Sequence, residues 1–346
     1  VNLQFKLLSA IGIIIIVSGH CYHGGMELAY NWFPPYSYNL ALFVFISGYF
    51  YKTDYEENVG KYIWKRTKRL LIPAYLWNIF YGCMVAFLGL FGFTIGAKPD
   101  LYNLFVMPFV DGEAFQYNLG SWFVYPLFLV CIINVLFRKF LKLIHLDNEF
   151  IVLIVYLAIG MIGINTALEN PTAINGIVKL LVRTMFFLPC YEFGRFYKAV
   201  LEKKDTLNNV AYFAIIFAVQ LILLTFCKDL EYTPSSFTKF NNGFIIPYIS
   251  SITAIAFWLR VSRLLVPAIG NSKLVRLIAD NTYGIMVNQL VGFMCLKFVF
   301  YGLSLITSGS LFGDFNVASF KSSIWYYYLP SGLQQWAFVY LIFGLF

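Results

Sequence analysis

Residues 7–20 read LLSAIGIIIIVSGH, an uninterrupted apolar run that ends in a histidine. The four isoleucines from Ile13 to Ile16 do not alternate with polar residues, as the strands of a membrane barrel would, so the run predicts a spanning helix. His20 would then lie at membrane depth, where a neutral imidazole is unfavourable unless it has partners. An ionisable residue inside a spanning helix is a functional-site hypothesis, which makes His20 the first candidate.

The rest of the chain has the same apolar character. Of its 346 residues, 60% are hydrophobic and 12% are charged, and the mean hydropathy is +0.71. Soluble domains carry about 25% charged residues, so this composition excludes a water-soluble globule. No signal peptide followed by a soluble domain is evident. We therefore predict an all-α, polytopic integral membrane helical bundle that forms a single domain over residues 1–346.

Ten apolar runs are candidate spanning helices, because about 20 apolar residues cross the hydrocarbon core of a bilayer. They lie near residues 5–23, 38–51, 70–95, 121–137, 150–166, 177–196, 209–227, 242–259, 281–301 and 325–346.

The basic residues predict how these helices are oriented. With a cytoplasmic N-terminus, loops 52–69, 138–149, 195–208 and 260–280 face inward and hold 6, 3, 4 and 4 Lys or Arg residues. Lys6 brings the inward total to 18, against 4 on the outward side. The positive-inside rule therefore predicts a cytoplasmic N-terminus. The net charge of +8 reflects this asymmetry, and we expect no nucleic-acid partner.

The first run also places polar residues on one helix face. Lys6 and Ser9 precede His20 by 14 and 11 residues, so the three side chains fall within about 40° of one another around the axis. Lys6 would lie near the cytoplasmic end, and His20 about 21 Å further toward the outside. One interpretation is a catalytic face with a cation toward the cytoplasmic end and a titratable base toward the outside. The alternative is a structural His20, satisfied by a neighbouring helix.

A metal site is the weaker interpretation of His20. His23 follows on roughly the same side, but no acidic or cysteine partner has matching spacing. The six cysteines all lie in or beside apolar runs without a Cys-x-x-Cys pair, which is typical of packing residues. We expect neither a metal nor a disulfide framework.

Residues 61–73, KYIWKRTKRLLIP, carry five positive charges within nine positions. Such a cluster attracts anionic lipid headgroups and fixes topology. It also suits a phosphorylated cytoplasmic ligand, because arginine presents a fork of donors to phosphate oxygens. The sequence leaves both interpretations open. The residues that would hold such a ligand are Lys65, Arg66, Lys68 and Arg69.

Three further cations lie inside predicted spans, where each costs about 2.5–3.5 kcal/mol if it faces lipid at the helix centre. Lys179 and Arg183 are four residues apart and share one face, which we expect to turn toward the bundle interior. Lys297 is typical of a residue that snorkels to the interface.

Two aromatic segments complete the candidate site. Residues 45–50, FISGYF, contain Ser47 and Tyr49, and residues 120–124, GSWFV, contain Trp122. Small residues let helices approach closely, and Tyr and Trp suit membrane interfaces, so packing is the alternative to function.

The succession of these segments resembles the membrane-bound acyltransferase 3 family, which includes many bacterial glycan O-acetyltransferases. The similarity extends over nearly the full chain. The segments that match the family are Ser9 to Gly12 with Gly19-His20, Phe45 to Phe50, Lys65 to Pro73, Trp122-Phe123 and Thr282 to Ile285. Two positions depart from the family pattern. Ser9 stands where the family has a basic residue, so either Lys6, one turn earlier on nearly the same face, takes over that role or the role is lost. Asn288 stands where a histidine often occurs.

The resemblance implies transfer of an acyl group, usually acetyl, from cytoplasmic acyl-CoA (acetyl-CoA) to a hydroxyl of an extracytoplasmic or lipid-linked glycan. It implies a bacterial cytoplasmic (inner) membrane location and membrane lipids as surroundings. We also expect that the chain is part of a polysaccharide synthesis complex or of a homo-oligomer. His20 would be the general base, beside Lys6 and Ser9.

The basic cluster would hold the CoA phosphates, and the remaining candidates would line the acyl-CoA site or stabilise the oxyanion. These are Lys179, Arg183, Ser47, Tyr49 and Trp122. The alternative functions are a polysaccharide exporter without acyl transfer and a catalytically silent scaffold.

Overall fold

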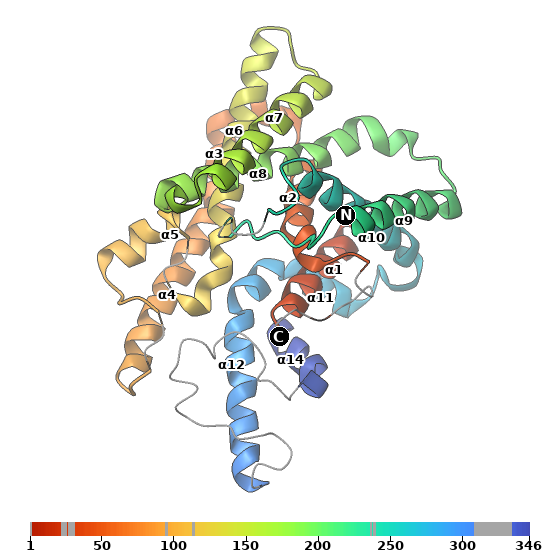
Figure 1. Ribbon diagram of the computed structural model, residues 1–346. Coiled ribbons are helices and arrows are strands. Elements are labelled where there is room, and N and C mark those ends of the chain that lie inside the picture. Colours follow the sequence, from red (N-terminus) through yellow and green to blue (C-terminus); the bar gives the residue numbers. More distant parts are fainter. Residues whose placement is uncertain are drawn as a thin grey trace.

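The computed structural model describes residues 2–21, 26, 32–93, 96–112, 115–235, 237, 240–307 and 334–346, and all regular structure within them is helical (Figure 1). The predicted all-α class is therefore confirmed. His23, and the first residues of the run expected over 325–346, lie outside these ranges.

The apolar runs form the major helices. Their bounds are α1 Leu3–Gly19, α2 Asn39–Tyr49, α4 Ile72–Gly89, α6 Val124–Leu143, α7 Glu149–Glu169, α8 Gly176–Phe196, α9 Asn209–Phe226, α10 Ile246–Ile269, α12 Thr282–Ile306 and α14 Ala337–Leu345. Shorter elements connect them: η1 Pro35–Ser37, η2 Thr53–Glu56, α3 Val59–Arg66, η3 Thr67–Leu71, η4 Tyr102–Val106, α5 Met107–Val110, η5 Gln116–Phe123, η6 Pro171–Ala173, η7 Tyr197–Leu201, η8 Glu202–Lys204, α11 Lys273–Asp280 and η10 Gln334–Trp336.

Within the described residues, six helical segments are long and apolar enough to cross a membrane, which makes this a multi-pass membrane protein. They are Val59–Gly89, Tyr117–Leu143, α7, α9, α10 and α12. The apolar helices α1 and α2 are shorter. Each of the ten expected runs overlaps a helix, but the count of ten spans and the cytoplasmic N-terminus stay predictions.

The outer surface of the bundle is apolar, as lipid contact requires. Val210 and Phe226, near the two ends of α9, are 82% and 80% exposed. Among the described helices, α9 packs chiefly against α10, so most of its circumference faces outward. Large apolar side chains that stay exposed in this way mark a surface covered by another apolar phase.

The expected loop over residues 52–69 is instead largely helical. Helix α3 continues through η3, a π-helical turn, directly into α4. The cause is Pro73, which lacks an N–H group and whose ring clashes with the carbonyl of Arg69 in a regular α-helix. The backbone hydrogen bonds therefore reach back five residues instead of four, and the Ile72 N–H donates to the Thr67 carbonyl. The basic residues therefore sit on a rigid helical extension of a spanning segment.

The C-terminal ends of α6 and α8 and the N-terminal end of α7 are joined by buried charges. Arg138 is 1% exposed and contacts Glu149 and Glu192, each at 2.7 Å. The sequence places Arg138 in the loop 138–149, where it counts among the basic residues that predict the orientation of the helices. It lies instead in the last turns of α6, where its charge is paired, because an unpaired buried guanidinium is costly.

Helices α2 and α8 cross at backbone contact. A Cβ atom on Gly48 would lie 1.8 Å from the Tyr191 carbonyl oxygen, and one on Gly194 would lie 1.9 Å from the Phe45 carbonyl oxygen. Glycine at both positions lets the two backbones touch, as small residues do between membrane helices. The crossing also fixes α2, whose N-terminal end reaches the site described below.

We predict that Gly48→Ala lowers the thermal unfolding temperature of the detergent-solubilised protein, because the added methyl group forces α2 and α8 apart at a cost of about 1–3 kcal/mol or more. Gly302→Ala is the matched control, since a Cβ atom there meets nothing within 4 Å. Equal stability of the two variants would contradict the close crossing.

Candidate functional site

A cavity of about 220 Å³ lies where α1 ends and α2 begins. Its other walls come from η5, from the segment 232–235 and from one face of α12. Polar groups converge there from His20, Asn39 and Gln289, while Trp122 and Met286 supply apolar surface. A small cavity that combines an imidazole with apolar walls is the strongest candidate for chemistry in the described part of the chain.

His20 is placed by the end of α1. The helix stops at Gly19, and His20 is its capping residue, with its backbone N–H bonded to the Val17 carbonyl at 3.0 Å. The Tyr36 hydroxyl donates to the Gly19 carbonyl at 3.0 Å, which satisfies an acceptor that the helix end leaves open. The expected run over 5–23 therefore ends earlier as a helix, and the imidazole projects from its terminus into the cavity.

Gln289 on α12 is a hydrogen-bond partner of His20. Imidazole Nδ1 lies 2.9 Å from the Gln289 side-chain oxygen, and the Gln289 amide nitrogen donates to the Met286 carbonyl at 3.1 Å. The Met286 carbonyl can only accept, so it fixes which end of the amide faces His20. Nδ1 must then carry the proton in the neutral ring, and Nε2 is left as the basic nitrogen.

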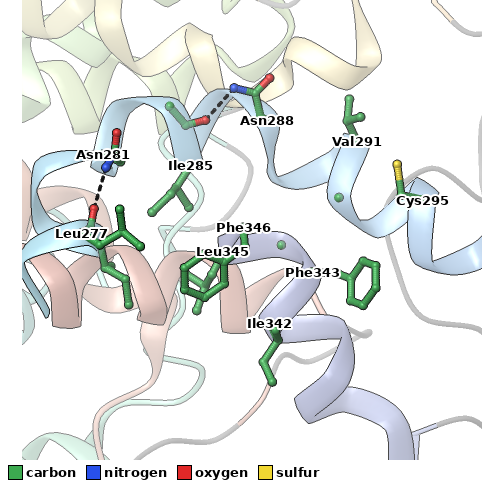
Figure 2. A pocket seen from close by; sticks show the side chains of 14 residues that line it. Leu277, Asn281, Ile285, Asn288, Val291, Cys295, Ile342, Phe343, Leu345 and Phe346 are labelled. Atoms are coloured by element: carbon green, nitrogen blue, oxygen red, sulfur yellow. Dashed lines mark hydrogen bonds between the residues drawn. The ribbon is translucent and has the colours of Figure 1, made fainter. Parts of the chain in front are cut away.

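Asn288, the position where the family often has histidine, lies about 100° around α12 from Gln289 and faces a different cavity. Its amide donates to the Gly284 carbonyl at 2.9 Å and accepts from Tyr81 at 2.8 Å. It lines a groove of about 690 Å³ between α12 and α14, shown in Figure 2. This groove is larger than the His20 cavity, but its only titratable lining residue among those described is Cys295. Volume alone therefore does not identify the site.

Arg183 supports the cavity wall from behind. Its guanidinium lies 4.5 Å from the centre of the Trp122 ring. It donates to the Asp111 carbonyl at 2.6 Å and also to the carbonyls of Pro234 and Ser235. Trp122 and the segment 232–235 are cavity walls, so this single 1%-exposed side chain holds two of them in place.

Lys179 adds a second anchor one turn away. Its ammonium contacts the Asp111 carboxylate at 2.7 Å. Both cations face the protein interior, as the sequence predicted for this helix face. Neither lines the described cavity, so the geometry favours an anchoring role for Lys179 and Arg183 over direct contact with an oxyanion.

Four other candidates lie away from His20. Lys6 pairs with Asp280 at 2.8 Å, and Ser9 donates to the Phe5 carbonyl within its own helix at 2.8 Å. The Ser47 hydroxyl likewise bonds the Phe43 carbonyl at 3.0 Å, and Tyr49 donates to Glu202 at 2.8 Å. None of the four lines the described cavity, so the structure does not bring them to the imidazole.

The basic cluster presents its charge at the surface. Lys65, Lys68 and Arg69 are exposed, whereas Arg66 is half-buried, with Nε donating to the Tyr62 hydroxyl at 3.0 Å. None of these four cations forms an ion pair with another described residue. Their positive charge therefore remains available to an anionic ligand or headgroup.

Sequence reasoning missed Gln289, although a signal was present. Glutamine within the apolar run 281–301 is an uncompensated polar group at membrane depth, and such groups pair with one another. The resemblance drew attention to Asn288 instead. Consecutive side chains of a helix point about 100° apart, so Asn288 and Gln289 line different cavities.

We predict that Arg183→Ala loosens the outer wall of the cavity. Loss of the guanidinium leaves buried carbonyls without donors, at a cost of about 1–3 kcal/mol for each group. The variant should unfold at lower temperature and be cleaved faster by protease within residues 228–242. Lys179→Ala, which removes only the partly buried pair with Asp111, should show a smaller change. Similar behaviour of both variants would contradict the anchoring role.

A family model described as an acyltransferase domain matches residues 2–301, a range that includes His20, the basic cluster and Gln289. Neither the curated proteins nor the solved structures contain a match.

Proposed function

This chain belongs to the acyltransferase 3 family, and from this premise we propose that it transfers an acyl group, most simply acetyl, from cytoplasmic acyl-CoA to a hydroxyl of an extracytoplasmic or lipid-linked saccharide. The family resemblance of the sequence is confirmed by the match over residues 2–301. The observation that carries the finer proposal is the oriented pair of His20 and Gln289 at a cavity. A structural histidine would need no such cavity beside its ring.

In this proposal His20 is the general base. Nε2 takes the proton from the saccharide hydroxyl as its oxygen attacks the thioester carbonyl. The tetrahedral intermediate then collapses, the carbon–sulfur bond breaks, and the imidazolium returns the proton to the departing CoA thiolate. Transfer is direct, so no acyl-enzyme forms. General base catalysis of this kind contributes about 10²–10⁴-fold.

The developing oxyanion needs fixed donors near the base. The Trp122 ring lines the cavity, and its indole N–H is a donor that could serve this purpose. Asn39 and Leu40, at the N-terminal end of α2, line the same cavity, where a helix terminus favours negative charge. We propose that Trp122 and this helix end stabilise the oxyanion and that Arg183 keeps Trp122 in position.

The cytoplasmic donor is supported by the charge distribution. The cluster from Lys65 to Arg69 has no acidic partner among the described residues, and arginine forks match phosphate oxygens. The excess of Lys and Arg on the predicted inner side supports a cytoplasmic N-terminus in a bacterial cytoplasmic membrane. Acyl-CoA would then approach from the end of the bundle that carries the basic cluster, and the saccharide from the opposite end.

We predict that purified protein in lipid nanodiscs moves label from [¹⁴C]acetyl-CoA to a glycan in a panel of candidate acceptors, and that His20→Ala reduces this rate by about 10²–10⁴-fold. His145→Ala, which removes an exposed histidine outside the cavity, is the control. Wild-type acylation by the His20 variant would refute the assigned base. Passage of unmodified glycan across vesicles, without labelled product, would instead support an exporter.

A second prediction concerns Gln289. Gln289→Leu removes the acceptor that fixes the Nδ1–H tautomer, so kcat should fall by on the order of 10–100-fold, as for other residues that orient a histidine. The KM for acetyl-CoA should stay near that of the wild type. Gln289→Glu keeps an acceptor at the same position and should retain more activity than the leucine variant. Equal loss in both would contradict a tautomer-fixing role.

A further inference from the structure

A cavity of about 410 Å³ is lined by residues of α7, α8, α9 and α10. Helix α7 packs chiefly on α8, and α9 packs chiefly on α10, so residues of both helix pairs contribute to its wall. Most of this wall is apolar, with Leu153, Phe193 and Ile252 among the lining residues. None of its lining residues belongs to the His20 cavity, so it is a separate site.

One end of this cavity is positively charged. Lys204, the last residue of η8, and Asp205 line it there. The Asp205 carboxylate is already paired with Arg260, and it contacts Arg263 at 3.3 Å. Lys204 is exposed and forms no ion pair with another described residue. Three cations therefore accompany one carboxylate, and the charge that remains favours an anion.

The apolar part of the cavity lies deeper in the bundle. With the predicted cytoplasmic N-terminus, residues 195–208 and 260–280 face the cytoplasm, so the charged end lies at that surface of the membrane. From Leu259, beside Arg260, the lining continues along α10 back to Ile252, and these seven residues of helix rise about 10 Å. Ile252 is 41% exposed, so the described protein does not cover this part of the lining.

Few polar groups line the apolar part. Apart from the charged end, the described lining contains two polar side chains, Tyr197 and Tyr212. The Tyr212 hydroxyl already donates to the Ala256 carbonyl at 3.0 Å. A sugar or a nucleotide would therefore leave most of its polar groups unpaired in this cavity, at a cost in free energy, whereas a hydrocarbon chain needs no partner.

We propose that this cavity binds a phospholipid with an anionic headgroup from the cytoplasmic leaflet. The headgroup phosphate would lie beside Lys204 and Arg263, and one acyl chain would pack against Phe193 and Ile252. Basic pockets between membrane helices on the cytoplasmic side suit such headgroups, and the charge and apolar lining of this cavity follow the same order as the two parts of the lipid. The site is independent of the proposed acyl transfer, because none of these residues lines the His20 cavity.

The test compares two lipids that have the same acyl chains and differ in headgroup charge. The full chain is delipidated in detergent and titrated with phosphatidylglycerol or phosphatidylcholine, and native mass spectrometry measures the affinity for the first lipid bound. The wild type should bind phosphatidylglycerol more tightly. Lys204→Gln should weaken this binding about fivefold, which corresponds to about 1 kcal/mol for one lysine near an anionic headgroup, and should leave phosphatidylcholine binding unchanged.

Lys139→Gln is the matched control, because it removes another exposed lysine on the same predicted side of the membrane but outside the cavity. It should change neither affinity. Equal affinity of the wild type for the two lipids would overturn the proposal. Equal effects of Lys204→Gln and Lys139→Gln would also overturn it, because the preference would then reflect general surface charge.

Ile252→Trp tests the apolar part of the site. The larger ring would occupy space that the acyl chain needs, so the affinity for both lipids should fall. Unchanged binding of both lipids by this variant would overturn the placement of the chain in the cavity. The same spectra report the oligomeric state. A wild-type dimer that Ile252→Trp disrupts would assign this surface to a second copy of the chain and would overturn the lipid site.

Discussion

Polar groups inside a membrane bundle must find partners within the protein, because hydrocarbon offers none. This constraint explains the buried ion pairs and hydrogen bonds of the cations at depth in this chain without any appeal to function. Arg138 reaches two carboxylates, and Arg183 reaches three carbonyls and an aromatic ring. Lys179 pairs with Asp111. Each pairing also joins helices or loops that are distant in sequence, so the same bonds that remove the cost of burial determine which segments surround the cavity.

The same constraint separates structural from functional polar groups. A side chain whose partners are all protein atoms has its burial explained by the fold, as Ser9 and Ser47 do through bonds within their own helices. His20 differs, because its partner fixes one ring nitrogen while the ring borders a cavity. Lys204 differs in another way, since it lines a second cavity and forms no ion pair with another described residue. Function is best sought where pairing within the protein is incomplete or is directed toward a cavity.

The sequence predicted the features that depend on local composition. The positions of the apolar helices follow from runs of hydrophobic residues, and the choice of His20 as a candidate follows from an ionisable group beside such a run. Features that depend on contacts between distant segments were not predictable in this way. Gln289 was missed because its direction depends on the rotation of α12, and Arg138 was misplaced because its carboxylate partners come from other helices. The helical course of residues 59–71 was missed because a π-helical turn, rather than a break, accommodates Pro73.

The choice of an amide to orient the histidine fits the proposed chemistry. A carboxylate in the place of Gln289 would also fix the tautomer, but it would stabilise the imidazolium by direct charge attraction. In apolar surroundings such an ion pair would hold the proton on the ring after the hydroxyl has been deprotonated. The thiolate leaving group must recover that proton for the base to be regenerated. A neutral acceptor orients the ring without adding a charge that would hold the proton on it, so the imidazolium can return the proton to the leaving thiolate.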